Sequence, residues 1–213
     1  MASIVLVHGW GFDHHVWDDV RARLSTAHHV ECVDFGFFGA VAPAPSFSQP
    51  VIAVGHSLGA CWWLTQSPIP WRRLLLINGF PRFTEAADYS PAVAPRVLAR
   101  MRTQFGRDPQ AVLDEFRTFC GAPPAPATFD AARLAAGLDW LAQWDGRARL
   151  AERTADIRAL AGGNDPIVPA VMSRAALVDL PADHLAYADA AGHVLPLTAP
   201  ALCAEWIEKI AAS

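Results

Sequence analysis

The sequence has little charge, no long hydrophobic run and no concentration of basic residues. Charged residues make up 18% of the 213 residues and the net charge is −4, whereas binding to nucleic-acid phosphates requires a concentrated basic surface. No apolar run reaches the roughly 18 residues of a membrane span. The first residues, "MASIVLVHGW", lack the basic and long apolar regions of a secretion signal. We therefore expect neither nucleic acid nor a membrane as a partner.

Cysteine is also scarce. The four cysteines lie far apart, at Cys32, Cys61, Cys120 and Cys203, and none forms the Cys-x-x-Cys pair typical of zinc or redox sites. A chain of 213 residues buries enough apolar surface to fold without disulfides. We expect reduced, mostly buried thiols and a cytoplasmic location.

Neither the histidines nor the glycines form a metal or cofactor motif. The pairs His14–His15 and His28–His29 are neighbours in sequence, so their side chains point to different faces of a helix or strand. No Gly-x-Gly-x-x-Gly or phosphate-binding loop pattern is present. We expect no metal and no cofactor.

Apolar residues, 53% of the chain, form short runs that alternate with helical patterns. The runs predict strands at 3–7, 29–34, 50–55, 72–78, 155–162 and 183–190. Helical patterns follow at 14–24, 58–66, 168–178 and 198–211. Near-continuous apolar runs are typical of strands covered on both faces. The alternation predicts a three-layer α/β fold with a mostly parallel sheet of about six strands.

One block interrupts this alternation. Residues 81–150 carry no strand signal and instead predict three or four helices, separated by proline and glycine. We interpret them as a helical lid inserted after the fourth strand, with 1–80 and 151–213 forming the core. Residues 35–49 are rich in proline, glycine and serine, so the crossover there is expected to lack a full helix.

The stretch "VIAVGHSLGACWWLTQ" carries the main chemical signal. It places Ser57 between Gly55 and Gly59, after a predicted strand and before a predicted helix. This is the strand–turn–helix setting of a nucleophile elbow, in which glycines let neighbouring backbone approach closely. A plain glycine-lined turn is the alternative. Cys61 lacks the glycine framing, so we interpret it as a core residue.

A serine nucleophile needs a base and an acid that orients the base. Downstream, "AGGNDPIVP" places Asp165 in a turn after a strand, and "DAAGHVLPL" places His193 in a loop after the last strand. Carboxyl ends of parallel strands share one edge of the sheet, so both side chains are expected near Ser57. The alternatives are a turn aspartate that caps the next helix and an ordinary loop histidine.

The glycine-rich "LVHGWGF" follows the first strand and predicts an oxyanion hole. We assign its donors to the backbone amides of Trp10 and of Leu58, the residue after the candidate nucleophile. The alternative is a simple turn. His8 is expected to support this loop.

Four motifs together resemble the α/β-hydrolase superfamily: "LVHGWGFDHHVW", "GHSLGA", "GGNDPIVP" and "AGHVLPLTAP". Within it, "HGWG", "PRVLARMRTQF" and "GLDWLAQWDGRARL" are most similar to the pimeloyl-acyl-carrier-protein methyl ester esterases of biotin synthesis. The resemblance implies a serine carboxylesterase that removes the methyl group from a pimeloyl chain held on acyl carrier protein. Ser57 is then the nucleophile, His193 the base and Asp165 the orienting acid. We expect the protein to be a monomer.

The family binds its carrier through arginines on the lid, and Ala111 and Glu115 stand at two of those positions here. Other lid arginines could form a different basic face: Arg96, Arg100, Arg102, Arg107, Arg117 and Arg133. Aromatic residues that could line an acyl channel are Trp10, Phe80, Phe105, Phe116, Phe119, Trp140 and Trp144. Each could equally be a core residue. A broad carboxylesterase or thioesterase and a non-catalytic binding protein of the same fold remain alternatives.

Overall fold

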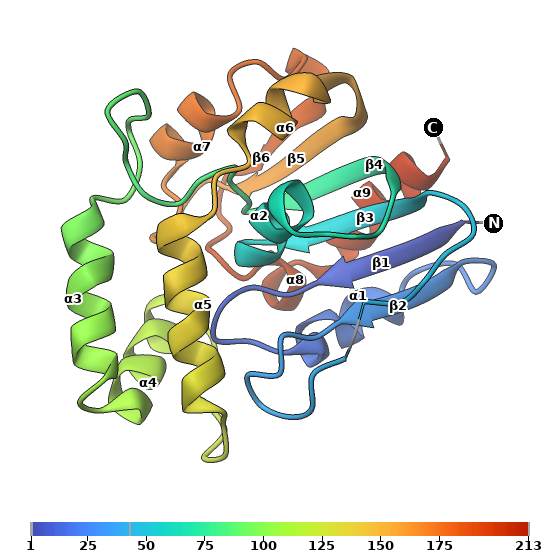
Figure 1. The fold of residues 1–213 in the computed structure, drawn as a ribbon. Helices are drawn as coiled ribbons and strands as arrows, with labels where there is room; N and C mark the ends of the chain where they lie inside the picture. Colours follow the sequence, from blue (N-terminus) through green and yellow to red (C-terminus); the bar gives the residue numbers. More distant parts are fainter. Residues whose placement is uncertain (1, 43, 213) are drawn as a thin grey trace.

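The computed structural model describes residues 2–42 and 44–212 and contains one parallel sheet. Figure 1 shows its six strands in the order β2-β1-β3-β4-β5-β6, and every adjacent pair is parallel. The strands are β1 (Ser3–Val7), β2 (His29–Val33), β3 (Val51–His56), β4 (Trp71–Ile77), β5 (Ile157–Gly162) and β6 (Leu185–Ala188). Because all six run in one direction, their carboxyl ends share one edge.

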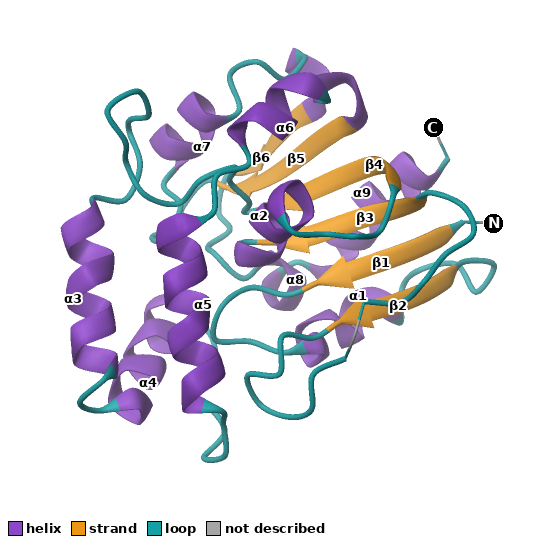
Figure 2. Cartoon of the chain, in the orientation of Figure 1, coloured by secondary structure: helices purple, strands orange, loops and turns teal. Residues whose placement is uncertain are grey.

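Helices cover both faces of the sheet, which gives three layers (Figure 2). One face carries α2 (Leu58–Thr65), α6 (Arg147–Glu152) and α7 (Ala170–Ala176). The other carries α1 (Asp18–Arg21), α8 (Leu195–Thr198) and α9 (Pro200–Ala211). Short 3-10 turns lie at η1 (His14–Trp17), η2 (Thr154–Asp156) and η3 (Ala182–His184).

Strand β1 shows why this sequence forms a doubly covered sheet. Val5 and Val7 belong to the apolar core on the α2 face, and Ile4 and Leu6 belong to the core on the α9 face. All four side chains are fully buried, so an uninterrupted apolar run satisfies both faces at once. The predicted three-layer fold with six parallel strands is confirmed.

Three further helices, α3 (Pro95–Phe105), α4 (Pro109–Phe119) and α5 (Ala131–Gln143), lie beyond the carboxyl ends of the strands (Figure 1). Proline occupies the first position of α3 and α4, where a missing N–H costs nothing. Asp108 and Asp130 cap α4 and α5 by accepting hydrogen bonds from first-turn amides. The helix α6 also falls between β4 and β5 in the sequence, but it packs against α2 on the face of the sheet.

The connection from β2 to β3 runs without a helix through its described residues, 34–42 and 44–50. Four cysteines are free thiols, with Cys61, Cys120 and Cys203 buried and Cys32 partly buried. Across the described ranges, no helix has the length and apolar character needed to span a membrane.

Candidate active site

Ser57 lies at the turn between β3 and α2 with a φ of 53° and a ψ of −117°. This backbone conformation is strained for a residue with a Cβ, and it persists only because its surroundings enforce it. The two flanking glycines show how. A Cβ on Gly55 would lie 2.5 Å from the Ala60 Cα, and one on Gly59 would lie 2.3 Å from the Val7 carbonyl oxygen. Only glycine therefore permits this close contact between β3, α2 and the end of β1.

His193 lies within hydrogen-bond distance of both Ser57 and Asp165. The His193 Nε2 is 3.1 Å from the Ser57 Oγ, and the His193 Nδ1 is 2.8 Å from the Asp165 Oδ2. A carboxylate can only accept, so Nδ1 carries the proton and Nε2 is free to accept from the serine hydroxyl. All three side chains are buried. The residues come from positions up to 136 apart in the chain, at the ends of β3, β5 and β6.

Asp165 uses its two oxygens for different tasks. Oδ1 accepts from the amides of Ile167 and Val168 at 2.8 and 2.9 Å, while Oδ2 faces His193. Burial on its own raises the pKa of this carboxyl, but the charge and hydrogen bonds of His193, Val168 and Asn78 outweigh it, and the pKa falls below its usual value. Asp165 therefore stays ionised. The same side chain both caps its own turn and contacts His193, so these two predicted roles are not alternatives.

Asn78, which follows β4, was missed by the sequence reasoning. Its Nδ2 donates to the Asp165 Oδ2 at 2.5 Å and to the Gly192 carbonyl at 3.0 Å. The residue has a φ of 47°, a conformation that asparagine adopts more readily than most residues. The available signal was a single amide at the end of the apolar run "LLLIN", at the same sheet edge as Ser57.

His56, the residue before Ser57, makes a hydrogen bond to the histidine loop. Its Nε2 lies 2.9 Å from the His193 carbonyl oxygen and donates to it. Complete burial, and secondly the neighbouring His193, lower the pKa of His56 to about 3. His56 is therefore neutral near pH 7 and links the nucleophile turn to the histidine loop.

The loop after β1 lies directly against the nucleophile turn. A Cβ on Gly9 would lie 3.0 Å from the Ser57 Cβ. The Trp10 amide, one predicted oxyanion donor, makes no hydrogen bond to any described residue. The Leu58 amide opens α2, and the first amides of a helix have no intrahelical acceptor. Among the described residues, neither predicted donor is used by another acceptor, so the assignment of both to an oxyanion hole stays a prediction.

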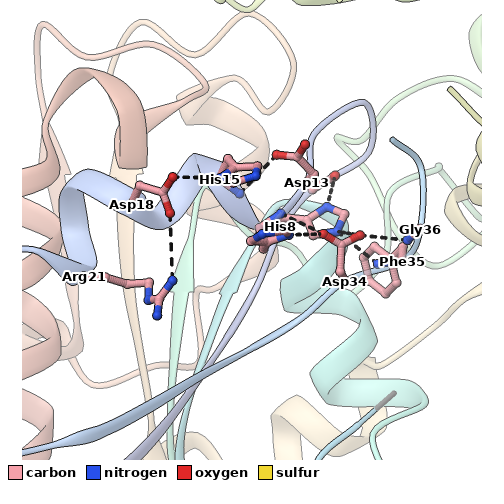
Figure 3. Close-up of polar contacts among 10 residues, drawn as sticks. His8, Asp13, His15, Asp18, Arg21, Asp34, Phe35 and Gly36 are labelled. Atoms are coloured by element: carbon pink, nitrogen blue, oxygen red, sulfur yellow. Dashed lines mark hydrogen bonds and ion pairs between the residues drawn. The ribbon is translucent and has the colours of Figure 1, made fainter. Parts of the chain in front are cut away.

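A buried network supports this loop on its other side. Figure 3 shows His8 beside Asp34, whose two oxygens also accept from the amides of Gly36 and His14 at 2.8 and 2.9 Å. His8 donates through Nδ1 to the Gly9 carbonyl at 2.9 Å and accepts from the Phe35 amide at 3.1 Å. The adjacent histidines His14 and His15 have different partners. His14 contacts Asp34 in this network, whereas His15 contacts Asp18. In the described part of the chain, no group of three or more His, Cys, Asp or Glu could hold a metal.

A cavity of about 870 Å³ lies between α3 and α4 and reaches Pro166 and Ile167, next to Asp165. Of the aromatic residues predicted to line an acyl channel, Phe116 and Phe119 line it. The others lie elsewhere: Phe80 packs on Phe83, Phe105 on Trp10, and Trp140 stacks on Trp144. Lining residues that the sequence reasoning did not name include Val97, Met101 and Val112.

A parallel sheet with a serine turn, a histidine and a carboxylate at one edge defines the class of α/β hydrolases. The chain belongs to the alpha/beta hydrolase family, whose model matches residues 4–206. Two relatives are named pimeloyl-[acyl-carrier protein] methyl ester esterase. The one from Legionella pneumophila (strain Paris) is 29% identical over 189 residues, covering 78% of this chain and 77% of the relative. The one from Aromatoleum aromaticum is 28% identical over 243 residues, covering 98% and 97%.

Solved structures share the fold. An esterase from Exiguobacterium antarcticum superposes with a TM-score of 0.82 at 17% identity, covering all of this chain and 92% of that one. A bromoperoxidase from Bacillus anthracis gives a TM-score of 0.75 at 19% identity, with coverage of 100% and 92%. These two carry different activity names, so the fold alone does not assign a substrate.

Proposed function

We propose that this chain is a serine carboxylesterase that hydrolyses the methyl ester of an acyl chain, namely the pimeloyl-acyl-carrier-protein methyl ester of biotin synthesis. The single observation that carries the chemistry is the Ser57–His193–Asp165 arrangement, with distances of 3.1 and 2.8 Å. The proposed substrate is taken from the names of the relatives. The two described above share the name pimeloyl-[acyl-carrier protein] methyl ester esterase, and one of them aligns over 98% of the chain.

In the first half of the reaction, the His193 Nε2 takes the proton of the Ser57 hydroxyl as Oγ attacks the ester carbonyl carbon. The carbonyl oxygen becomes an anion held by the amides of Trp10 and Leu58. His193 then returns its proton to the methoxy oxygen, the carbon–oxygen bond breaks and methanol leaves. Asp165 stabilises the transient imidazolium and keeps Nε2 directed at Ser57.

In the second half, His193 removes a proton from a water molecule that attacks the acyl-enzyme carbonyl. The same two amides stabilise the second oxyanion. Collapse breaks the bond to Ser57 Oγ, which takes the proton back from His193, and the free carboxylic acid leaves. Every catalytic group in these two half-reactions is a side chain or a backbone amide of this chain, and water is the second nucleophile.

We further propose that the cavity between α3 and α4 receives the acyl chain, and that α3, α4 and α5 together form the lid. The cavity wall contains Val97, Leu98, Met101, Val112 and Phe116, which suit a methylene chain. Two apolar side chains of its lining are also exposed, since Val97 and Phe119 are 55% and 61% exposed.

The nucleophile assignment is tested with Ser57→Ala. We expect turnover of the methyl ester and of short p-nitrophenyl esters to fall by at least about 10⁴-fold, because no other described group replaces the hydroxyl. The melting temperature should change by only a few degrees, because alanine keeps the Cβ in the same turn. Substantial remaining turnover would disprove the assignment. If the wild type hydrolyses only short p-nitrophenyl esters, the serine esterase assignment stands but the carrier-bound methyl ester is excluded as its substrate.

We also propose that acyl carrier protein docks on α3. Arg96 and Arg100 are exposed one helical turn apart, and Arg100 lines the cavity, so a carrier bound there would deliver its acyl chain into it. Within the described residues, neither arginine pairs with a carboxylate. Two lid arginines are already engaged: Arg102 pairs with Asp139, and Arg117 binds backbone carbonyls.

Reversing both charges with Arg96→Glu and Arg100→Glu should raise KM for the carrier-bound ester by about tenfold or more, through repulsion of an acidic partner. The kcat on p-nitrophenyl acetate should stay within about twofold of wild type. The matched control reverses Arg21 and Arg23, at and beyond the end of α1. An equal effect of both pairs, or no effect of the α3 pair, would contradict docking on α3.

A further inference from the structure

Trp10 is held by all three helices that lie over the site. Its ring packs edge-on against Phe105 of α3 and Phe116 of α4, with centroids 6.0 and 4.8 Å away. Its Nε1 donates to the Leu134 carbonyl of α5 at 2.8 Å. The ring is 2% exposed, so it is an anchor in the lid and has little surface to offer a substrate. The backbone amide of this same residue is the proposed oxyanion donor.

A second attachment connects α4 to the next residue of the loop. The guanidinium of Arg117 donates through Nη1 to the Gly11 carbonyl at 2.8 Å and through Nε to the Pro123 carbonyl at 2.7 Å. It also lies over the Phe12 ring, 4.8 Å from the centroid. Gly11 has a φ of 74°, so the loop turns sharply at the point where Arg117 holds it.

The environment of Arg117 differs from that of a solvated surface arginine. Its side chain is partly buried, and burial lowers the pKa of its guanidinium. Among the described residues, no carboxylate forms an ion pair with it, so carbonyl oxygens and an aromatic ring replace its hydration. Burying a cation in this way is costly unless its donors are well placed, which fits a role in fixing backbone geometry.

We propose that Arg117 is a positioning residue for the oxyanion hole: it fixes the Trp10–Gly11 turn to the lid, so that the Trp10 amide points at the reacting carbonyl. Two side chains then hold the backbone carbonyls on either side of Trp10 in the sequence. His8 holds the Gly9 carbonyl, which belongs to the same peptide unit as the Trp10 N–H, and Arg117 holds the Gly11 carbonyl two residues further on. Placement of the lid and strength of the oxyanion donor are thereby coupled. This inference rests on the proposed serine esterase activity.

The test compares wild type, Arg117→Met and Arg117→Lys on a p-nitrophenyl ester and on an alkylboronic acid. The boronic acid forms a tetrahedral anion on Ser57 and reports the oxyanion hole without turnover. We expect kcat and boronate affinity to fall together by about tenfold in Arg117→Met, because small displacements of an oxyanion donor have large effects. KM should remain within about twofold. Arg117→Lys keeps the charge but replaces the two donor nitrogens, Nε and Nη1, with a single ammonium nitrogen on a differently shaped side chain. We therefore expect kcat and boronate affinity to fall by a similar factor in this variant.

Arg102→Met is the matched control, since it removes a guanidinium from the lid whose partner, Asp139, lies on α5. Active-site titration with a fluorophosphonate corrects each rate for the folded fraction, so that poor folding is not mistaken for poor positioning. Unchanged kcat and boronate affinity in Arg117→Met, or an equal fall in Arg102→Met, would overturn the inference. A wild type that neither hydrolyses the ester nor reacts with the fluorophosphonate would instead refute the proposed function.

Discussion

The carboxylate of Asp165 accepts four hydrogen bonds, and the donors differ in what they fix. The amides of Ile167 and Val168 belong to the same turn, so they hold the carboxylate only relative to its own loop. Asn78 comes from the end of β4 and also holds the Gly192 carbonyl, in the residue before His193. Asn78 therefore fixes both the acid and the histidine loop to the end of a third strand, β4.

Asn78→Gly tests this role. Glycine accepts the φ of 47° without strain but removes both hydrogen bonds, so we expect kcat on an ester to fall about tenfold while KM changes little. The free energy of unfolding should fall by about 1–3 kcal/mol, because the Asp165 and Gly192 oxygens each lose a buried donor. Steady-state kinetics and urea unfolding measure the two effects. Full retention of kcat would show that the turn amides suffice to orient Asp165.

Asn78 also shows where reading single residues from the sequence fails. Ser57, Asp165 and His193 each stand in a motif whose spacing indicates chemistry, whereas Asn78 is one amide after an apolar run. Its importance depends on contacts with Asp165 and Gly192, which lie 87 and 114 positions away and which no local motif encodes. The aromatic residues pose the same problem, because Phe80 and Phe116 have one side chain type and entirely different surroundings.

Among the elements, strands and central helices were predictable because their patterns are local. The predicted strand 3–7 coincides with β1, and the prediction 58–66 differs from α2 by one residue. Convergence of the site was also predictable in outline, since parallel strands bring their carboxyl ends to one edge. The two glycines around Ser57 then add the contacts with Val7 and Ala60 that hold the turn.

The connecting elements were less predictable. The pattern of residues 81–150 predicted three or four helices without fixing where each begins. Pro91 and Pro95 both suit a first helical position, and α3 begins at Pro95. How α3, α4 and α5 pack over the sheet edge depends on contacts such as those of Trp10 with Leu134 and Phe116, which join residues more than 100 positions apart. Local patterns do not encode such pairings.

At the scale of the whole molecule, a buried imidazole joins the two halves of the site and affects overall stability. His56 is the last residue of the central strand β3, and its hydrogen bond to the His193 carbonyl spans 137 positions of the chain. Burial, the largest cause, together with His193, holds its pKa at about 3, against 6.5 for an ordinary histidine. The folded protein therefore stays unprotonated at this residue over a pH range in which the unfolded chain binds a proton.

This difference predicts how stability depends on pH. A depressed folded-state pKa stabilises the protein fully above pH 6.5, and the contribution is lost as the pH falls from 6.5 towards 3. We expect the free energy of unfolding to fall more steeply for wild type than for His56→Gln between about pH 6 and 4.5, by up to about 1.4 kcal/mol per pH unit. Denaturant titrations at intervals of half a pH unit measure both slopes.

His29→Gln provides the control, because it removes a histidine whose side chain is 58% exposed on β2 and leaves His56 in place. Its slope should match that of wild type, so that the difference in His56→Gln is assigned to burial and not to the loss of one imidazole. Equal slopes in wild type and His56→Gln would mean that His56 takes up its proton without unfolding the protein. The hydrogen bond to the His193 carbonyl would then hold the histidine loop in either charge state, since Nε2 donates with or without a proton on Nδ1.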